Sequence, residues 1–276
     1  MEKKDIKIVV AAHKPYQMPE DGMYIPLHVG AEGKTNIDGT PLDLGYQKDN
    51  EGDNISVKNP YYCELTGIYY AWKNISADYL GLVHYRRYFR GKNKSKDPFA
   101  CIVTKTEMDE IFEEHSVVVP KKRRYYIETL YSHYAHTHYA EHLDYVREII
   151  ERQCPEYVKV YDKVINQTSG YMFNMMVMKR QLFDDYCEWL FKILFELEKR
   201  VDTEQTQMSA FQSRFYGRVS EIIFNVWLEY QIHSGAIKKK EIQELPFIYM
   251  EKINWVKKGV SFLKAKMFHK KYDSSF

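Results

Sequence analysis

Short apolar runs that end in polar residues recur along the chain. Residues 6–12, 80–83 and 117–119 are rich in Val, Ile or Leu, a composition typical of strands buried on both faces of a sheet. A further run, residues 171–178, carries Met, Phe and Val around Asn174. We therefore predict central strands of an α/β sheet at these four positions.

Helical spacing of apolar residues separates these runs. Asn59 can cap a helix and Pro60 suits its first position, which predicts a helix as far as residue 72. Thr104 and Glu107 have the spacing of a capping box and predict another helix. Further helices are expected over residues 143–150, 183–197, 208–216 and, capped by Ser220, 220–230.

Two stretches differ from this pattern. Residues 19–53 are rich in Gly, Pro, Asp and Asn, so we expect one long excursion of the kind that is functional or mobile. From Lys238 onward, ten lysines stand against four acidic residues. The apolar spacing within residues 251–276 predicts a basic amphipathic helix, which would lie on a membrane surface or dock on the protein body.

Composition narrows the class of protein. Hydrophobic residues make up 45% of the 276 positions, ample for a globular core, and the 24 tyrosines suit contacts with sugars or nucleotides. The net charge of +2 is too small for a nucleic-acid binder that relies on its bulk field. The sequence contains no Cys-x-x-Cys pair, signal peptide or membrane-spanning run, and this favours the cytoplasmic side with reduced thiols.

Cations and aromatic residues crowd the end of the run at 80–83. His84, Arg86 and Arg87 follow it almost directly, with Tyr85 among them. Ligands bind at the carboxyl ends of strands in open α/β sheets, and a guanidinium can hold a phosphate through two hydrogen bonds. We therefore predict an anion-binding site, the alternative being a solvated strand end whose arginines pair with nearby carboxylates.

Other polar residues stand where a ligand could meet them. His13 and Lys14 end the first apolar run, and residues 121–124 form a basic tetrad that either meets a phosphate or is a solvated loop. Near the predicted start of the first helix, where free N–H groups favour an anion, are Asn54, Lys58, Asn59 and Glu64.

Four histidines between residues 133 and 142 and one buried asparagine are also candidates. His133, His136, His138 and His142 lack the His-Glu-x-x-His spacing of a zinc site, so we expect polar cleft or interface residues rather than a metal centre. Asn174, placed within a predicted strand, needs a hydrogen-bond partner or a ligand.

Several blocks, taken together, resemble a bacterial family of capsular and exopolysaccharide glycosyltransferases that was long listed as a domain of unknown function. The resemblance covers residues 5–250, which we expect to be one domain of residues 1–250, followed by the basic tail of 251–276. It is carried by NISVKNPYYCELT (54–66), WKN (72–74), GLVHYRRYF (81–89), YMFNMMVM (171–178), FDDYCEWLF (183–191) and SEIIFNVWL (220–228).

The resemblance implies a GT-A-like fold, with a central mixed sheet flanked by helices, a nucleotide-binding half and an acceptor half. It also implies transfer of a hexose, galactose in pyranose or furanose form among the candidates, from a UDP-sugar to a lipid-linked saccharide at the inner face of the cell membrane. GT-A enzymes usually hold Mn²⁺ or Mg²⁺ with Asp-x-Asp, and this chain has His84-Tyr85-Arg86 in the comparable place. We therefore expect cationic side chains to stabilise the diphosphate, with a divalent ion left open because Asp43, Asp49 or Asp53 could supply ligands.

These expectations assign roles to individual residues. The donor would be held by His13, Lys14, Asn54, Lys58, Asn59 and Glu64. The leaving diphosphate would be neutralised by His84, Arg86 and Arg87. If the reaction inverts the anomeric configuration, Glu221, or else Asp184, would take the proton of the acceptor hydroxyl. The acceptor would be lined by His133, His138, Tyr171 and Asn174.

Two other classes of protein remain open from the sequence. One is a nucleotide-sugar-binding subunit of polysaccharide assembly without turnover. The other is an RNA-binding protein that uses tyrosines and basic loops, against which the nearly neutral body argues.

Overall fold

The computed structural model describes residues 3–201 and 208–251, which divide into two compact units. Unit 1 is built from three separated segments, residues 3–121, 173–187 and 237–251, and unit 2 from the described residues of 122–172 and 188–236. The predicted amphipathic tail, apart from Glu251, lies outside the described residues. Within the described ranges, no helix has the length and apolar character that a bilayer crossing requires.

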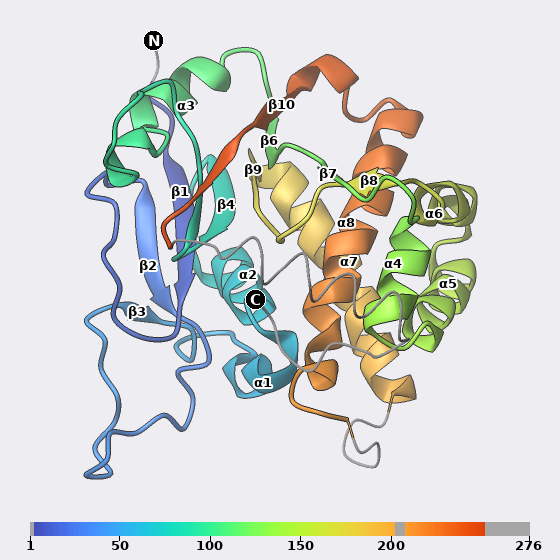
Figure 1. The fold of residues 1–276 in the computed structure, drawn as a ribbon, viewed down its shortest axis with the longest axis horizontal. Helices are drawn as coiled ribbons and strands as arrows, with labels where there is room; N and C mark the ends of the chain where they lie inside the picture. Colours follow the sequence, from blue (N-terminus) through green and yellow to red (C-terminus); the bar gives the residue numbers. More distant parts are fainter. Residues whose placement is uncertain (1–2, 202–207, 252–276) are drawn as a thin grey trace. The chain divides into compact units, whose positions relative to one another are not determined.

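Unit 1 contains a nine-stranded mixed sheet, so the predicted fold class is confirmed (Figure 1). Its main path runs β10–β6–β9–β4–β1–β2–β3, and β5 joins β4 to β11 at the side. The strands are β1 (Ile6–Ala12), β2 (Tyr24–His28), β3 (Gln47–Lys48), β4 (Tyr79–His84), β5 (Arg87–Phe89), β6 (Val117–Pro120), β9 (Met176–Lys179), β10 (Ile242–Leu245) and β11 (Phe247–Tyr249).

The direction of the strands determines where their polar ends meet. Strand β1 is parallel to both β2 and β4, while β9 is antiparallel to β4 and to β6. Since β4 and β6 are both antiparallel to β9, they run in the same direction. Strand β10 is parallel to β6 and therefore shares that direction. The carboxyl ends of β1, β2, β4, β6 and β10 therefore lie at one edge of the sheet, and β9 begins at that edge.

Buried apolar side chains explain the central strands. From Ile8 to Val10 the residues of β1 are fully buried, and so are Leu80 and Leu82 of β4. Between them Gly81 is required, because a Cβ there would lie 2.3 Å from the carbonyl oxygen of Met176 on β9. The predictions for residues 6–12, 80–83 and 117–119 are confirmed.

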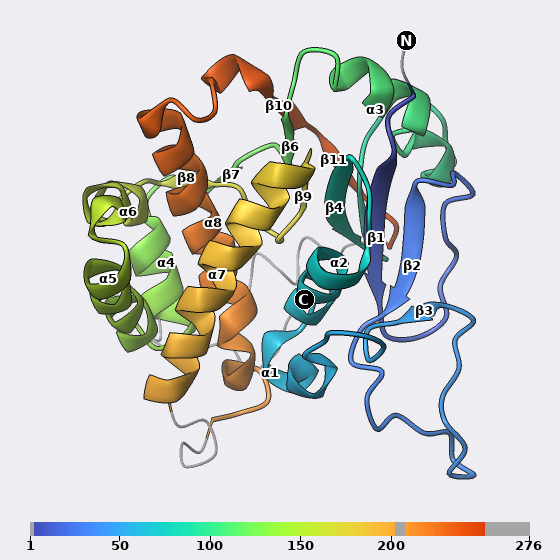
Figure 2. The same cartoon turned by 180° about the vertical axis from the view of Figure 1, so that it is seen from behind.

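Helices accompany the sheet of unit 1 (Figure 2). The predicted helix from Asn59 is divided: α1 (Asn59–Tyr62) ends at Cys63, whose φ is +53°, and α2 (Leu65–Asn74) follows and contacts β1 and β4. The predicted capping box of Thr104 and Glu107 is confirmed at the start of α3 (Lys105–Ile111). Short 3₁₀ turns occur at Ser56–Lys58, Phe99–Cys101 and Lys239–Glu241.

Unit 2 is mostly helical. Its elements are β7 (Arg123–Arg124), α4 (Leu130–Thr137), α5 (Glu141–Gln153), α6 (Val158–Ile165), β8 (Ser169–Gly170), α8 (Phe215–Ser234) and 3₁₀ turns at Pro155–Tyr157 and Gln212–Arg214. Helix α7 (Arg180–Arg200) begins in unit 1 and continues into unit 2. Ser220 does not cap a helix as predicted, because it lies buried inside α8, whose first residue is Phe215.

Candidate functional site

Aromatic side chains gather where β1 and β4 end. The ring of His13 lies 5.3 Å from that of Tyr85 in an edge-to-face arrangement, and Tyr16 stacks on Tyr85 at 3.7 Å. Burial and a hydrogen bond to Tyr16 raise the pKa of Tyr85 to about 12, so the Tyr85 phenol is neutral at physiological pH. The hydroxyl of Tyr46 fixes the segment by donating to the carbonyl of Tyr16 and accepting from its N–H.

Two cations lie over this tyrosine pair. The ammonium of Lys14 is 5.3 Å from the centre of the Tyr16 ring, and the guanidinium of Arg86 is 5.3 Å from that of Tyr85. Arg86 also approaches the carboxylate of Glu251 at 4.0 Å, with 35% and 57% of the two side chains exposed. Such a solvated pair is weak, so the Arg86 guanidinium can turn to another anion. We call Lys14, Tyr16, Tyr85 and Arg86 the tyrosine–cation cluster.

Arg87 has different surroundings from Arg86. Its guanidinium lies 4.4 Å from the centre of the Phe173 ring and 5.6 Å from that of Tyr249, which is its partner across β5 and β11. Stacking between aromatic rings stabilises a guanidinium and also restricts it. The two arginines that are adjacent in sequence therefore contact different rings.

His84 lies at the end of β4 and contacts the turn before β9. Its Nε2 is 2.5 Å from the carbonyl oxygen of Phe173. Burial lowers the pKa of His84 to about 4, against the opposing charge of Glu64 and with the help of Arg87. The ring is therefore neutral at pH 7 and donates its Nε2–H to that carbonyl. This corrects the expectation that His84 adds positive charge to the site.

The turn before β9 has an unusual backbone. Phe173 and Asn174 have φ values of +78° and +51°, a region that residues other than glycine seldom occupy. Asn174 donates from Nδ2 to the carboxylate of Glu64 at 2.8 Å, which joins the turn to the start of α2. The prediction that Asn174 lies within a strand is wrong, because β9 begins at Met176.

Asp49 is the anchor of the excursion that precedes α1. Its fully buried carboxylate accepts hydrogen bonds from the N–H groups of Gly30 and Ala31 and from the hydroxyls of Ser56 and Thr66, at 2.5–3.0 Å. Four donors engage both oxygens, so Asp49 does not fit the expected role of a metal ligand.

The other two candidate metal ligands accept local hydrogen bonds. Asp43 accepts from the N–H of Gly45, and Asp53 from the hydroxyl of Tyr69. Within residues 3–201 and 208–251, no three His, Cys, Asp or Glu side chains are grouped so as to hold a metal ion.

The polar residues around α1 mainly hold the chain itself. Asn54 accepts from the N–H of Ser56, and Asn59 donates to the carbonyl of Cys63 and the hydroxyl of Thr66. The ammonium of Lys58 is 6.0 Å from the centre of the Tyr62 ring. A part for these three side chains in donor binding stays a prediction.

The two candidate catalytic carboxylates lie in different units, and each forms an ion pair. Asp184, in unit 1, accepts from Nε of Arg180 at 2.8 Å, while Arg180 also donates to carbonyls at the end of α2. Glu221, in unit 2, is 7% exposed and accepts from Arg218 at 3.1 and 3.2 Å. Because α8 begins at Phe215, Glu221 is not in its first turn as expected.

The remaining predicted residues lie in unit 2. The backbone of Tyr171 is held by the amide of Asn225, which accepts from its N–H and donates to its carbonyl, while Lys122 lies 4.8 Å from the Tyr171 ring centre. His138 is buried and stacks on Tyr134 at 5.1 Å, as a packed ring would.

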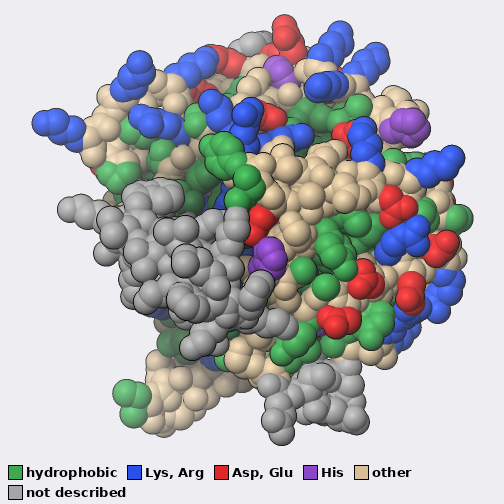
Figure 3. Space-filling model, turned by 45° about the vertical axis from the view of Figure 1, so that its right-hand side comes forward, with side chains coloured by type: hydrophobic (Ala, Val, Ile, Leu, Met, Phe, Trp, Pro, Cys, Tyr) green, Lys and Arg blue, Asp and Glu red, His purple; other side chains and the backbone are tan. Residues whose placement is uncertain are grey.

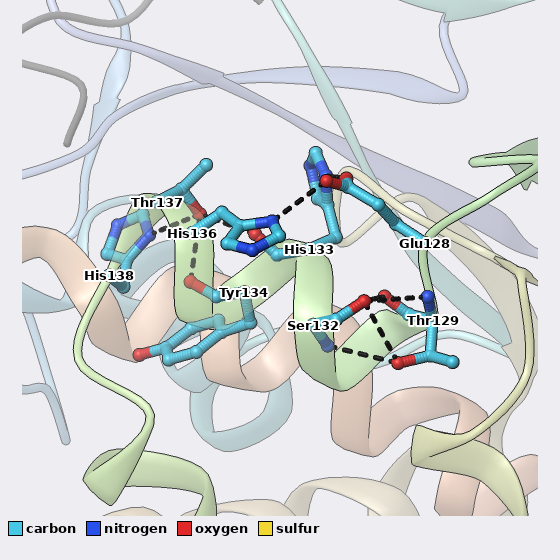
Figure 4. A network of polar contacts seen from close by, with 8 residues as sticks. All are labelled: Glu128, Thr129, Ser132, His133, Tyr134, His136, Thr137 and His138. Atoms are coloured by element: carbon cyan, nitrogen blue, oxygen red, sulfur yellow. Dashed lines mark hydrogen bonds and ion pairs between the residues drawn. The ribbon is translucent and has the colours of Figure 1, made fainter. Parts of the chain in front are cut away.

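His133 belongs to a network that the sequence only partly indicates (Figure 4). Its Nδ1 is 2.6 Å from the buried carboxylate of Glu128, whose other oxygen is 2.8 Å from Nδ1 of His136. The sequence does not single out Glu128, and it marks His136 only as one of four histidines expected in a polar cleft or an interface. What could have pointed to Glu128 in the sequence is its place directly before Thr129, the residue that caps α4. Thr129 forms a capping box with Ser132.

A solved apo structure of WbbM, a bifunctional glycosyltransferase, is similar with a TM-score of 0.78 and 29% sequence identity over 90% of this chain. The chain spans 46% of the length of that structure. A search of curated proteins found no match. Residues 7–232 match a family model described as "Domain of unknown function (DUF4422)", and the chain therefore belongs to that family.

Proposed function

We propose that this protein is a glycosyltransferase that moves a hexose from a nucleotide sugar to a saccharide acceptor. The observation that carries the proposal is the likeness to a glycosyltransferase over 90% of the chain at 29% identity. The tyrosine–cation cluster at the carboxyl edge of the sheet supports it, since open α/β sheets bind ligands at that edge.

The tyrosine–cation cluster has the chemistry of a nucleoside diphosphate site. A flat, half-buried phenol can stack on a base or a sugar ring, and a guanidinium can hold two phosphate oxygens at once. Lys14 and Arg86 would bind the diphosphate and stabilise the negative charge that develops on it as the glycosidic bond breaks. His84 would contribute by holding the turn at Phe173.

The finer assignments rest on the family resemblance. The donor would be a UDP-sugar, with galactose in pyranose or furanose form among the hexoses, and the acceptor a lipid-linked oligosaccharide of capsule or exopolysaccharide synthesis. The protein would then work at the inner face of the cell membrane. Lining of the acceptor by His133, His138 and Tyr171 and proton uptake by Glu221, or else Asp184, belong to the same proposal.

One observation favours a second candidate, a nucleotide-sugar-binding subunit without turnover. Both candidate bases, Glu221 and Asp184, are in ion pairs with arginine, so each carboxylate already has a cationic partner where an acceptor hydroxyl would have to approach. Binding of a nucleotide sugar without release of UDP in the presence of acceptor would distinguish this candidate from an enzyme.

An RNA-binding role has less support. The face drawn in Figure 3 carries acidic as well as basic side chains, in keeping with the net charge of +2. A salt-dependent affinity for single-stranded RNA that exceeds the affinity for nucleotide sugars would reverse this ranking.

The decisive experiment is a binding panel. UDP-galactose, UDP-galactofuranose, UDP-glucose and free UDP are added to the full chain, and the melting temperature and heat of binding are recorded. A ligand that binds the folded state raises the melting temperature. If no nucleotide sugar binds, the proposal fails.

A further inference from the structure

The segment between β7 and α4 in unit 2 exposes two neighbouring apolar side chains. Tyr126 is 81% exposed and Ile127 is 72% exposed. The other exposed large hydrophobic residues of the described ranges, Ile37 and Val57, stand singly in unit 1. Single apolar residues are ordinary on a protein surface, whereas a neighbouring pair at one tip indicates a surface that something covers. We call residues 122–127 the basic–aromatic loop.

The backbone of the basic–aromatic loop holds this pair outward. Tyr126 has a φ of +60°, a region that residues with bulky side chains seldom occupy. The N–H of Ile127 donates to the carbonyl of Tyr125 at 2.7 Å, which closes a tight turn around Tyr126. Such a conformation persists only where the surrounding contacts impose it, and segments of this kind concentrate at binding sites.

Contacts on both sides of the turn impose that conformation. Before the turn, β7 pairs with β8, and the N–H of Tyr125 donates to the carbonyl of Thr168 at 2.8 Å. After the turn, the buried carboxylate of Glu128 lies 2.6 Å from Nδ1 of His133 and 2.8 Å from Nδ1 of His136 (Figure 4). The tip is therefore held in place before any partner arrives, which lowers the entropy cost of binding.

Three cations directly precede the tip. Lys122, Arg123 and Arg124 occupy consecutive positions, and Lys122 and Arg124 are exposed. Lys122 lies 4.8 Å from the centre of the Tyr171 ring, and Arg123 lies 5.0 Å from that of Tyr125. Among the residues that the structure describes, no carboxylate forms an ion pair with any of these three cations. Their charge can therefore attract an anionic partner.

Size and chemistry favour a membrane surface as that partner. Two apolar side chains are too few for the core of a stable protein–protein interface, which buries about 800 Å² on each side. They suffice for shallow insertion among lipid headgroups, a position that suits the apolar ring and polar hydroxyl of a tyrosine. The cations beside the tip would then lie against anionic headgroups, each adding to the attraction.

We propose that the basic–aromatic loop docks on a bilayer that contains anionic lipids, with Tyr126 and Ile127 inserted among the headgroups. The sequence led us to expect membrane contact in residues 251–276, so this loop is a different surface. The inference goes beyond the proposed function, because a contact with lipid requires no sugar chemistry. It would bring the protein to the surface where a lipid-linked acceptor resides.

The first test measures binding of the full chain to vesicles, with neither donor nor acceptor present. We expect the wild type to bind vesicles of phosphatidylglycerol mixed with phosphatidylcholine more tightly than vesicles of phosphatidylcholine alone, and to lose affinity as salt is added. The double variant Tyr126→Ser/Ile127→Ser should bind about tenfold more weakly. The matched control is Ile37→Ser, which removes an exposed isoleucine of unit 1 and should bind like the wild type.

A second pair of variants separates the loop from net charge. Lys122→Gln/Arg124→Gln should weaken binding by about twentyfold, because each cation close to an anionic surface contributes about fivefold. Lys94→Gln/Lys96→Gln removes the same charge from exposed lysines of unit 1 and should have a much smaller effect. Equal weakening by the two double variants would show that net charge alone drives binding, and would overturn the proposal.

The third test reports insertion at the tip itself. In Tyr126→Trp, vesicles that contain brominated phospholipid should quench more tryptophan fluorescence than they quench in the wild type. In Ile37→Trp we expect no additional quenching. An indole at position 126 that brominated lipid does not reach would contradict insertion.

Two further outcomes would refute the docking of this loop. If Tyr126→Ser/Ile127→Ser binds vesicles like the wild type, another segment makes the membrane contact. If the wild type ignores vesicles and the same substitutions convert a dimer to a monomer, the tip joins two copies of the chain.

The nucleotide-sugar binding panel keeps this inference separate from the proposed function. Vesicle binding through the loop, in a protein that binds no nucleotide sugar, would support the docking surface and remove the transferase proposal. Nucleotide-sugar binding in a protein that ignores vesicles would do the reverse.

Discussion

The Nε2 atom of His84 lies 2.5 Å from the carbonyl oxygen of Phe173, a residue 89 positions further along the chain. This contact joins the end of β4 to the turn that precedes β9. The turn has positive φ at both Phe173 and Asn174, and its partner groups hold it in that conformation. The neutral state of His84 is thus part of how the carboxyl edge of the sheet is built.

The free energy of unfolding should fall with acidification because of His84. Its pKa is about 4 in the folded protein and about 6.5 when unfolded. Between these values the unfolded state binds more protons, so the contribution is present above pH 6.5 and is lost as the pH falls toward 4. Between pH 7 and pH 5 we expect a loss of about 1–2 kcal/mol, allowing for partial exposure of the ring.

The measurement is urea unfolding of the wild type and His84→Gln at both pH values. The variant should lose less stability on acidification, by about 1–2 kcal/mol. An equal loss in the two proteins would show that the His84 proton does not enter the folding equilibrium.

Substitution of Asn174 separates backbone strain from hydrogen bonding. Asn174→Ala loses the bond to Glu64 and places a poorly suited residue at φ +51°, which should destabilise the protein by about 2–3 kcal/mol. Asn174→Gly loses the same bond but tolerates the backbone, so its cost should be smaller by about 1 kcal/mol. Thermal and urea unfolding measure both. Equal costs would mean that the positive φ is not maintained in solution.

Substitution of the two neighbouring arginines should have different effects, one on ligand affinity and the other on the stability of the fold. Arg86→Ala should weaken binding of UDP or UDP-galactose by at least about tenfold with little change in melting temperature, because its ion pair with Glu251 is solvated. Arg87→Ala should lower the melting temperature, because its guanidinium packs against Phe173 and Tyr249. Lys92→Ala is the control, since Lys92 pairs with Glu110 on the surface. Unchanged UDP affinity in Arg86→Ala would remove that residue from the donor site.

Asp49 should be among the most sensitive polar positions of unit 1. Asp49→Ala leaves the N–H groups of Gly30 and Ala31 and two hydroxyls without their acceptor, so we expect a loss of about 3–5 kcal/mol or failure to fold. Ser56→Ala removes one of these donors and should cost about 1–2 kcal/mol. Asp38→Ala, at an exposed carboxylate that accepts from Thr40, should leave the melting temperature close to that of the wild type. Similar losses of stability for Asp49→Ala and Asp38→Ala would contradict the inference that the hydrogen bonds of Asp49 hold this part of the fold.

Burial on both faces made the central strands readable from the sequence. A continuous Val- and Ile-rich run such as Ile6–Ala12 has few other stable placements. By contrast, β2 (Tyr24–His28) lay unrecognised in the predicted excursion because it contains Pro26. That proline is tolerated because β3 pairs only with Leu27 and His28, leaving Pro26 beside β1 alone.

Pair contacts across long separations explain most of what sequence patterns missed at the site. Tyr16 stacks on Tyr85, which is 69 positions away in the sequence. Asn174 donates a hydrogen bond to Glu64, which is 110 positions away. Position alone drew attention to Arg86 and His84, but it could not distinguish a solvated cation from a neutral, largely buried ring. Glu128 was missed because an acid before a helix is common and only its two imidazole partners distinguish it.

Unit 1 is assembled from three stretches of chain separated by long insertions, and this affects when it can form during synthesis. Strands β10 and β11 come from residues 242–249, so the ribosome must reach residue 249 before this sheet can close. Until then the edges of β5 and β6 that pair with β11 and β10 remain unpaired. Nascent chains with such open edges are prone to mispairing. Slower elongation would prolong this exposure, so strains that overproduce the protein should gain more from less frequent initiation, which lowers the concentration of unfinished chains.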